Sequence, residues 1–434
     1  MIQVQTDILI IGAGIAGISA AVKAGRLGAQ VILIERYPFL GGMATVGMVS
    51  PFMRHTVGDQ SLVNGIFADI QSHMRSHQGM VDNGFSTEAF RFAVINLLEE
   101  ANVKVLTQCE LVKVDHANAH ITTITVSHAG ILKSITPQVV IDTSGDAQVS
   151  HLSGFQTMMG REKDHVSQAM TLFFRMGGIE FAPILKDVRA RPHDFFEWVN
   201  TEPDENGIIA VAGYYEAVKQ AHEKGVLSPT IKYLFFASLP GSGEASFNTT
   251  SVMDLKATSS KDLTQAERYA NAQVQEIVAL LKAEISGFEK AYLLETATQI
   301  GVRESRRMIG ERVMFADSIR SGEKFDDRIA RGCYGVDIHG NSGEDDIMEE
   351  LAEDAWYDIP KDCLLSKDVD NLLGAGKCIS ADFEAHGALR IMPTSAATGE
   401  AAGAWAALAI KNGSELRDVG TRLLQDQIRD NLGA

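Results

Sequence analysis

The sequence contains few cysteines, and no two of them are closely spaced. Four cysteines stand far apart in 434 residues, at Cys109, Cys333, Cys363 and Cys378. Iron–sulfur clusters and zinc knuckles need closely spaced thiols, so we expect neither and predict no metal site. A disulfide framework is typical of small secreted domains and is equally unexpected at this length. We therefore expect buried, inert thiols.

The sequence also lacks an excess of positive charge and a long hydrophobic run. Its 39 Lys and Arg residues against 56 Asp and Glu residues give a formal net charge of −17. Nucleic acids and anionic membranes bind through concentrated positive charge, so we expect neither as the main partner. The longest weakly polar run, residues 396–410, is too short and too interrupted for membrane insertion. Because no signal peptide is visible, we expect a cytoplasmic protein.

The first part of the chain carries the most informative pattern. We predict a buried strand over residues 7–11, an Ala-rich helix to about residue 27 and a second strand over residues 31–34. Gly12, Gly14 and Gly17 stand between the first strand and the helix in the spacing G-x-G-x-x-G, and Glu35 ends the second strand. In this context the glycines indicate a dinucleotide-binding βαβ unit.

Each residue of this motif has a physical role. Gly12 permits the tight turn, Gly14 lets a pyrophosphate approach the backbone, and Gly17 lets the helix pack closely on the strand. The free N–H groups and the dipole at the helix start favour the negative phosphates. Glu35 is suited to accept hydrogen bonds from ribose hydroxyls and disfavours a 2′-phosphate. The motif alone fits NAD and FAD equally well.

Three later segments favour FAD. Arg36 and the stretch Gly41-Gly42-Met43-Ala44-Thr45 follow the acidic residue, and two adjacent glycines let the chain run close to a second part of the same ligand. The segment 143–146, Thr-Ser-Gly-Asp, ends a predicted strand. The C-terminal stretch from Gly376 through residues 390–403 would return to the cofactor.

At these residues the chain resembles the FAD-dependent oxidoreductases, within the wider glutathione-reductase-like and fumarate-reductase-like FAD-binding fold. The resemblance covers residues 1–50, 143–147, 301–307 and 369–410, and it is loose over residues 155–260. Many relatives carry an acid after the glycine where this chain has Lys377. The resemblance implies cofactor contacts from Gly12, Gly14, Ala16 and Gly17 (pyrophosphate), Glu35 (adenosine ribose), Arg36, Gly41, Gly42, Met43 and Thr45 (ribityl and flavin side), the Val112 backbone (adenine), Ser144, Gly145 and Asp146 (adenosine half), and Gly376, Pro393, Ser395 and Ala396 (ribityl chain and pyrimidine).

The predicted fold is α/β. We expect a Rossmann-like FAD-binding domain with a central parallel sheet and a β-meander over about residues 103–135, formed discontinuously from residues 1–150 and 366–434. An α+β substrate domain would be inserted at residues 151–365. Helices are predicted over residues 87–101, with Ser86 as N-cap, and over 264–285, with a capping box from Thr264 to Glu267. The acidic segment 344–354 is predicted to be an exposed helix.

Arginines are the candidate substrate-binding residues. Arg303, Arg306 and Arg307 are dense enough for two guanidinium groups to converge on a carboxylate, and Arg390 precedes the C-terminal helix. The alternatives are internal ion pairs, from the cluster to Glu304 or Glu311 and from Arg390 to Asp382 or Glu384.

Histidines are the candidate proton carriers, because imidazole titrates near neutral pH. His386 precedes the C-terminal helix, His55 follows the Gly41-Gly42 turn, and His339 is a further candidate. The helix start at Pro393-Thr394-Ser395, capped by Thr394 or Ser395, would stabilise negative charge on a reduced flavin.

The preferred function is an FAD-dependent enzyme that moves a hydride between a small carboxylate-bearing substrate and flavin N5, with an unidentified electron acceptor and a possible homo-oligomer. Two alternatives remain: an NAD-dependent dehydrogenase that uses the N-terminal motif, and a flavoprotein that senses without turnover. A reductase with two nucleotide sites is disfavoured, since a second G-x-G-x-x-G and a C-x-x-C pair are absent from the sequence.

Overall fold

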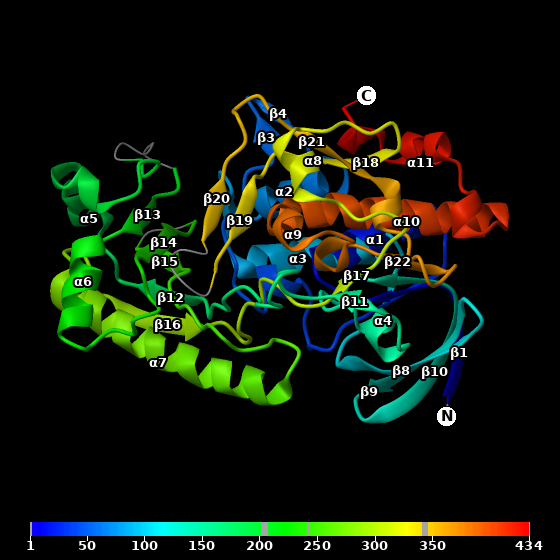
Figure 1. The fold of residues 1–434 in the computed structure, drawn as a ribbon, viewed down its shortest axis with the longest axis horizontal. Helices are drawn as coiled ribbons and strands as arrows, with labels where there is room; N and C mark the ends of the chain where they lie inside the picture. Colours follow the sequence, from blue (N-terminus) through cyan, green and yellow to red (C-terminus); the bar gives the residue numbers. More distant parts are fainter. Residues whose placement is uncertain (1, 201–206, 241–242, 341–345, 434) are drawn as a thin grey trace.

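The computed structural model describes residues 2–200, 207–240, 243–340 and 346–433. Figure 1 shows two sheets at opposite ends of the long axis. The larger sheet lies at the right with both chain termini, and a smaller sheet lies at the left with helices α5 (Phe181–Ala190), α6 (Tyr215–Glu223) and α7 (Ser260–Glu284). The predicted α/β class is confirmed.

The large sheet has seven strands in the order β7-β2-β1-β10-β9-β8, with β22 also paired to β10. Strands β7, β2, β1, β10 and β22 run parallel, and β8, β9 and β10 form the antiparallel meander. The strands are β1 (Ile2–Ile11), β2 (Val31–Ile34), β7 (Lys104–Leu106), β8 (Cys109–Ala117), β9 (His120–His128), β10 (Ile131–Asp142) and β22 (Leu372–Gly374). This is the Rossmann-like arrangement that the sequence predicts.

Strand β10 corrects one prediction. The sequence suggests a meander strand over residues 131–135 and a separate buried strand over 138–142, but both belong to one strand. Its first half pairs with β9, and its last three residues pair with β22 on the same edge. The first half is partly exposed and the last four residues are buried, so the two halves differ in hydrophobicity.

Helices α1 (Ile15–Arg26) and α10 (Met392–Asn412) pack directly against each other. A Cβ at Gly399 would lie 2.1 Å from the carbonyl oxygen of Ala16, and one at Gly403 would lie 2.2 Å from that of Ala20. The glycines of α10 therefore permit a backbone approach that larger residues would block. This contact brings the two ends of the chain to the same side of the large sheet.

Of the remaining helices of this part, α4 contacts β8 of the large sheet, and the others contact helices or the short sheets. They are α2 (Ile66–Ser76), α3 (Thr87–Glu100), α4 (Gln148–Leu152), α8 (Ala316–Arg320), α9 (Phe383–Leu389) and α11 (Thr421–Gln427). The predicted cap of α3 is confirmed, since Ser86 Oγ accepts a hydrogen bond from the Ala89 N–H at 3.1 Å. Short two-stranded sheets pair β3 (Thr56–Val57) with β4 (Gln60–Ser61), β5 (Met80–Val81) with β6 (Gly84–Phe85), β11 (Thr157–Met158) with β17 (Arg307–Met308), β18 (Arg328–Gly332) with β21 (Tyr357–Pro360), and β19 (Val336–Ile338) with β20 (Ile347–Glu349).

The smaller sheet is antiparallel, with five strands in the order β13-β14-β15-β12-β16. They are β12 (Phe174–Gly177), β13 (Ala210–Gly213), β14 (Leu234–Ser238), β15 (Glu244–Phe247) and β16 (Tyr292–Thr296). Helix α7 begins earlier than predicted, because Ser259 Oγ caps it by accepting from the Asp262 N–H at 3.3 Å. The predicted capping box is wrong: Thr264 lies inside the helix, and Glu267 accepts from the Ile300 N–H.

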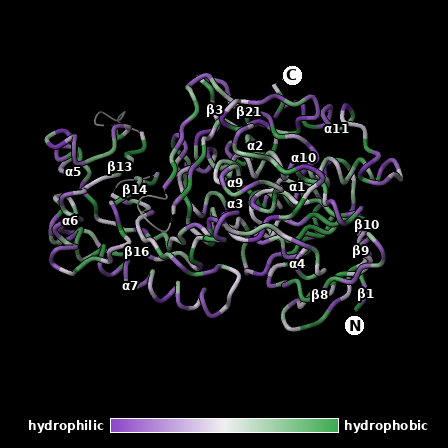
Figure 2. Tube along the Cα trace, viewed as in Figure 1, coloured by the Kyte–Doolittle hydropathy of each residue, from purple (hydrophilic) through white to green (hydrophobic). Residues whose placement is uncertain are grey.

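Hydrophobic side chains form three cores, two on opposite faces of the large sheet and one under the small sheet. In Figure 2 the strands of the large sheet are mostly hydrophobic, whereas the turn before α11 is hydrophilic. The core around α1 and α10 draws on residues 8–141 and 314–432, and the core under the small sheet draws on Met48 and residues 170–300. Residues 314–365 thus share the first core. The domain boundaries at 150 and 365 stay a prediction.

The acidic segment is not helical where the structure describes it. Residues 344 and 345 lie outside the described residues, and residues 347–349 form strand β20 against β19. Glu349 forms an ion pair with Arg320 at 2.6 Å, so Arg320 partly neutralises the negative charge of this segment.

Three further features bear on the site. All four cysteines are buried and free, as expected. Within the described ranges, no helix combines the length and hydrophobicity needed to cross a membrane. The same ranges contain no cluster of three or more His, Cys, Asp or Glu side chains suited to a metal ion.

Candidate active site

A groove opens where β1 ends and α1 begins, and glycine backbone forms its rim. Gly12 has a φ of +96°, and a Cβ there would lie 2.7 Å from the Thr143 carbonyl oxygen. A Cβ at Gly17 would lie 1.9 Å from the Gly12 oxygen, and one at Gly42 would lie 2.8 Å from the Gly14 Cα. Side chains would therefore separate segments that must approach each other closely.

The N-terminus of α1 faces this groove without a side-chain cap. The first N–H groups of a helix have no partner inside the helix, so they remain available to a ligand. Gly14, Ile15 and Ala16 all line the groove. Together with the helix dipole, this arrangement suits a pyrophosphate.

Glu35 is held at the edge of the groove by backbone groups. Its carboxylate accepts hydrogen bonds from the Ala13 N–H at 2.8 Å and from the Tyr37 N–H at 3.0 Å. The side chain is buried, yet it lines the groove. Each oxygen keeps a lone pair that suits a ribose hydroxyl.

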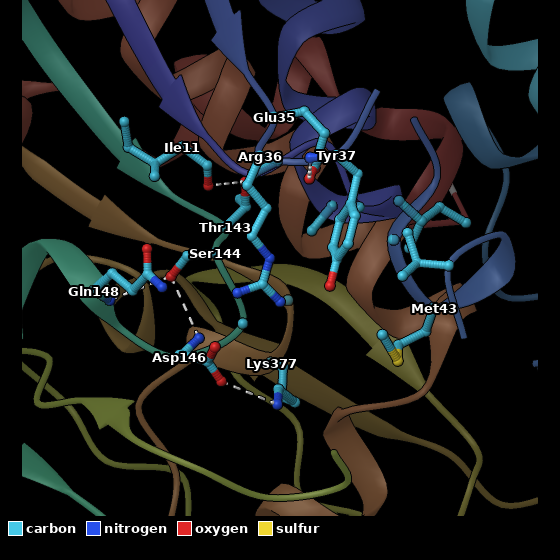
Figure 3. Close-up of a pocket in the computed structure, with 18 of the residues that line it drawn as sticks. Ile11, Glu35, Arg36, Tyr37, Met43, Thr143, Ser144, Asp146, Gln148 and Lys377 are labelled. Atoms are coloured by element: carbon cyan, nitrogen blue, oxygen red, sulfur yellow. Dashed lines mark hydrogen bonds and ion pairs between the residues drawn. The ribbon is translucent and has the colours of Figure 1, made fainter. Parts of the chain in front are cut away.

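Arg36 and Tyr37 extend across the groove and meet Gln299 from the far part of the chain. Arg36 Nη2 donates to Gln299 Oε1 at 2.7 Å, and the Tyr37 hydroxyl donates to the same oxygen. Figure 3 shows Arg36 and Tyr37 projecting side by side among the other lining residues. The sequence predicted Arg36 but gave no signal for Tyr37 or Gln299, because their contact joins segments about 260 residues apart.

The opposite wall carries a partly buried ion pair between Lys377 and Asp146. Lys377 Nζ lies 3.5 Å from Asp146 Oδ1 and donates to the Val302 carbonyl oxygen at 3.0 Å. Burial opposes ionisation of Asp146, but Lys377 and a hydrogen bond from Ser305 together lower its pKa. Lys377 is thus neutralised and anchored, as Figure 3 shows at the base of the groove.

The groove collects most of the predicted cofactor residues. Those that line it are Gly12, Gly14, Ala16, Glu35, Arg36, Gly41, Gly42, Met43, Ser144, Gly145, Asp146, Gly376 and Ser395. Gly376, at a φ of +65°, would place a Cβ 2.7 Å from the Ala16 Cβ. The beginning and the C-terminal part of the chain therefore meet at one groove.

Other predicted cofactor residues lie behind or beside the lining: Gly17, Thr45, Val112, Pro393 and Ala396. Thr45 braces the glycine turn by donating to the Leu40 carbonyl oxygen at 2.7 Å. Val112 is 46% exposed, and its neighbours Glu110 and Leu111 line the groove instead. The pairing of β8 with β9 shifts register between Leu111 and Lys113, and this irregularity leaves Val112 unpaired in the ladder.

Helix α10 also begins beside the groove, but not as predicted. It starts at Met392 with Pro393 in its first turn, and Ile391 is the N-cap, so the predicted caps Thr394 and Ser395 are wrong. No side chain caps this end. Its first N–H groups and its positive dipole end are therefore available to a ligand.

The arginines at residues 303–307 do not converge. Arg307 is buried and pairs with Glu304 at 2.5 Å, which matches the internal ion pair left open as an alternative. Arg306 is partly exposed. Arg303 points elsewhere and donates to the Ala169 carbonyl oxygen at 2.8 Å and to Thr171 Oγ1 at 2.5 Å.

Arg303 instead lies close enough to Arg390 and Asp337 to interact electrostatically with both. Arg390 Nη2 lies 3.3 Å from Asp337 Oδ2, and the alternative partners are engaged elsewhere: Asp382 caps α9, and Glu384 pairs with Arg320. His339 Nε2 lies 3.3 Å from Asp337 Oδ1, and the Tyr334 hydroxyl donates to Oδ2 at 2.8 Å. We call Arg303, Asp337, His339 and Arg390 the Asp337 cluster.

The charges of the Asp337 cluster do not cancel. Burial and the neighbouring Arg390 lower the pKa of Arg303 to about 10, so both arginines are cations at neutral pH. Burial opposes ionisation of Asp337, but His339 and Arg390 hold its pKa well below its usual range. Burial and Arg303 lower the pKa of His339, which favours neutral imidazole. One positive charge is left over.

None of the three candidate histidines is among the residues that line the groove. His386 is fully buried, its Nε2 lies 3.1 Å from the Lys377 carbonyl oxygen, and burial lowers its pKa well below the usual value. His55 is 6% exposed and packs edge-on against Phe67.

A cavity of about 350 Å³ adjoins the Asp337 cluster. Asp337 and His339 belong to its polar lining, together with Arg54, Glu349 and Glu350. Five aromatic side chains also line it: Phe196, Trp198, Tyr233, Phe235 and Tyr334. The sequence analysis missed this cavity, because its walls come from segments far apart in the chain.

Solved structures show the same fold. A geranylgeranyl bacteriochlorophyll reductase-like protein from Thermoplasma acidophilum and the flavin-dependent brominase Bmp2 are each 12% identical, at a TM-score of 0.51. Both matches cover 98% of this chain and 83% of the other. A search of curated protein sequences finds no match.

The groove fits FAD on its own geometry. Cβ atoms at Gly12, Gly17 and Gly42 would clash with neighbouring backbone at its rim. Two uncapped helix ends border the groove, and Glu35 supplies a carboxylate at its edge. The family model described as FAD dependent oxidoreductase matches residues 7–428. The chain belongs to the FAD-dependent oxidoreductase family and is an enzyme with FAD as its cofactor.

Proposed function

We propose that the enzyme moves a hydride between a small, carboxylate-bearing substrate and flavin N5. The observation that carries the proposal is the uncancelled positive charge of the Asp337 cluster. Arg390 belongs to this cluster and also lines the groove, so a group bound there would lie beside the cofactor. Bound FAD supplies the two-electron acceptor or donor.

Arg303 and Arg390 would hold the substrate carboxylate. Among the described residues, the carboxylate within ion-pairing distance of Arg390 is that of Asp337. Arg303, by contrast, donates hydrogen bonds to uncharged oxygens, those of Ala169 and Thr171. Two guanidinium groups facing one carboxylate favour a second anion, because a partly buried cation without a counter-charge is unfavourable. The substrate would complete the charge balance.

His339 would move the proton that accompanies the hydride. Its Nε2 faces Asp337, so Nδ1 is left to accept a proton, and the lowered pKa keeps the ring neutral. Asp337 is then a positioning residue, since it orients His339 and Arg390 rather than touching the substrate. The uncapped start of α10 would stabilise negative charge on the reduced cofactor.

Anaerobic reduction of the purified holoenzyme tests this proposal. A panel of carboxylates is mixed with the oxidised enzyme, with the matched amides as uncharged controls, and bleaching of the flavin absorbance is followed. We expect at least one carboxylate to bleach the flavin and its amide to react far more slowly. Equal rates for acid and amide would contradict the proposal.

Two arginine variants sharpen the test. Arg303→Gln should raise the substrate concentration for half-maximal bleaching by about 10- to 100-fold, the range expected for a lost charged hydrogen bond. Arg306→Gln is the matched control, because Arg306 lies in the same segment outside the Asp337 cluster. Equal effects of the two substitutions would exclude a specific role for Arg303.

The remaining expectations stay proposals. A cytoplasmic location and a homo-oligomer are not needed for the chemistry above. An electron acceptor is needed, because a flavin reduced by the substrate must be reoxidised before the next turnover.

A further inference from the structure

One wall of the cavity beside the Asp337 cluster is aromatic, whereas Arg54, Glu349 and Glu350 are among the residues that line the rest of it. Phe196 lies 5.0 Å from Tyr233 and 6.1 Å from Trp198, and Trp198 lies 6.1 Å from Phe235, between ring centroids. All three contacts have the tilted or edge-to-face angles that aromatic groups prefer. They form a continuous aromatic surface, which we call the aromatic wall (Phe196, Trp198, Tyr233 and Phe235).

Strand β14 explains how the wall is built. Successive residues of a strand face opposite sides of the sheet, so Leu234 and Phe236 enter the core and are fully buried. Phe235 and the preceding Tyr233 face the other side and line the cavity. The sheet thus places aromatic side chains on the face opposite its own hydrophobic core.

The described residues leave part of the aromatic wall exposed. Trp198 is 47% exposed, although large aromatic side chains usually become buried. An uncovered aromatic surface inside a cavity marks a binding site for an apolar group. The cavity volume of about 350 Å³ falls within the range of small-molecule sites.

The polar end of the cavity continues to both arginines. Tyr233, Asn248 and His339 line this cavity and also the adjacent pocket that contains Arg303. Asp337 lines the cavity and contacts Arg390, which lines the cofactor groove. An apolar wall and an uncancelled positive charge therefore lie at two ends of one space.

We infer that the substrate is an aromatic carboxylate, whose ring lies on the aromatic wall and whose carboxylate meets Arg303 and Arg390. This inference rests on the proposed function, because it uses the same carboxylate site. It adds the chemical class of the rest of the substrate. Trp198 and Phe235 become specificity-determining residues for the ring.

Equilibrium binding to the oxidised holoenzyme tests the inference without turnover. Phenylpropionate, butyrate and phenylpropanamide are titrated separately, and perturbation of the flavin visible spectrum gives each Kd. Phenylpropionate carries both the ring and the charge, butyrate lacks the ring, and the amide lacks the charge. We expect phenylpropionate to bind about tenfold or more tightly than either control compound.

Two variants assign each half of the ligand to its site. Trp198→Ala should weaken phenylpropionate about tenfold and leave butyrate unchanged, whereas Trp198→Phe should retain most of the difference. Arg303→Gln should weaken phenylpropionate and leave the amide unchanged. Phe315→Ala is the control, since Phe315 is 57% exposed and lies outside the cavity. Flavin content and thermal unfolding verify that each variant is folded.

The outcomes separate the two proposals. Equal affinities for phenylpropionate and butyrate, equal effects of Trp198→Ala on both acids, or no binding by any acid would overturn the inference. If an aliphatic carboxylate then bleaches the flavin and aromatic ones do not, the proposed function stands without it. If the predicted binding pattern is found but acids and amides bleach the flavin equally, the proposed hydride transfer with a carboxylate substrate is contradicted. The inferred binding site for an aromatic carboxylate is then still supported.

Discussion

Replacing Gly399 with alanine is the most informative perturbation of the fold, because it acts where the start and the end of the chain touch. An added Cβ would lie 2.1 Å from the Ala16 carbonyl oxygen, well inside contact distance, and that oxygen belongs to rigid helix backbone. The helices would have to separate. Ala16 lines the cofactor groove, so the separation would also deform the FAD site.

Two opposing effects set the magnitude. In an exposed helix, glycine-to-alanine substitution stabilises by about 1 kcal/mol through helix propensity. Overpacking a tight contact typically destabilises by about 1–3 kcal/mol. Because the added Cβ would lie 2.1 Å from a backbone oxygen, we expect a cost at the upper end of this range. We therefore expect a net loss of about 1–2 kcal/mol together with weaker FAD retention.

Thermal unfolding and FAD titration of the apoprotein measure the two effects. Gly420→Ala is the control, because Gly420 has a φ of −61° and its Cβ would meet nothing within 4 Å. The control should change stability by no more than about 0.5 kcal/mol. If Gly399→Ala raised the melting temperature and left FAD affinity unchanged, the inferred contact between α1 and α10 would be refuted.

Three further perturbations test separate parts of the structure. Glu400→Ala should destabilise by about 3–5 kcal/mol in chemical denaturation, because Lys23, 2.9 Å from Glu400, would lose its partner in a largely buried site; a loss below 1 kcal/mol would contradict a buried pair. Glu35→Ala should raise the Kd for FAD at least about tenfold in apoprotein titration, since it removes the ribose acceptor and unpairs two backbone N–H groups, and an unchanged Kd would exclude Glu35 from the site. The free energy of unfolding should fall as pH drops below 6.5, the usual histidine pKa, because His386 takes up a proton in the unfolded chain but stays neutral when buried. His386→Gln should reduce the slope of unfolding free energy against pH by up to about 1.4 kcal/mol per pH unit. An unchanged slope would mean that His386 is not the cause.

The sequence predicted the parts of the fold that local chemistry determines. The G-x-G-x-x-G turn, α1 and β2 follow from glycine spacing and short apolar runs, and the structure places them as expected. The Ser86 cap of α3 is equally local. In each case the decisive interaction lies within a few residues along the chain.

Features that depend on distant partners were missed or misread. Strand β10 looked like two strands because β9 and β22 share one of its edges, and β22 is supplied by residue 372 onward. The partner of Arg390 is Asp337 rather than a neighbour in sequence, because strand β19, which contains Asp337, packs against α9. Such contacts are set by tertiary packing, which periodicity and spacing do not encode.

The candidate site divides in the same way. The glycine rim and Glu35 were readable from the motif, whereas the aromatic wall was not. Tyr233 and Phe235 alternate with core residues in a strand that reads as uniformly buried, so the sequence gave no reason to assign them to a cavity. The three candidate histidines were indistinguishable until the structure placed His339 alone in the Asp337 cluster.

A crystal structure of the FAD-loaded enzyme tests the central claim most directly. The account predicts the pyrophosphate at the first turn of α1 and the isoalloxazine ring between Gly376 and the start of α10, with Arg390 facing its substrate side. Density that places the ring away from α10, with the tail making no contact to the cofactor, would contradict it.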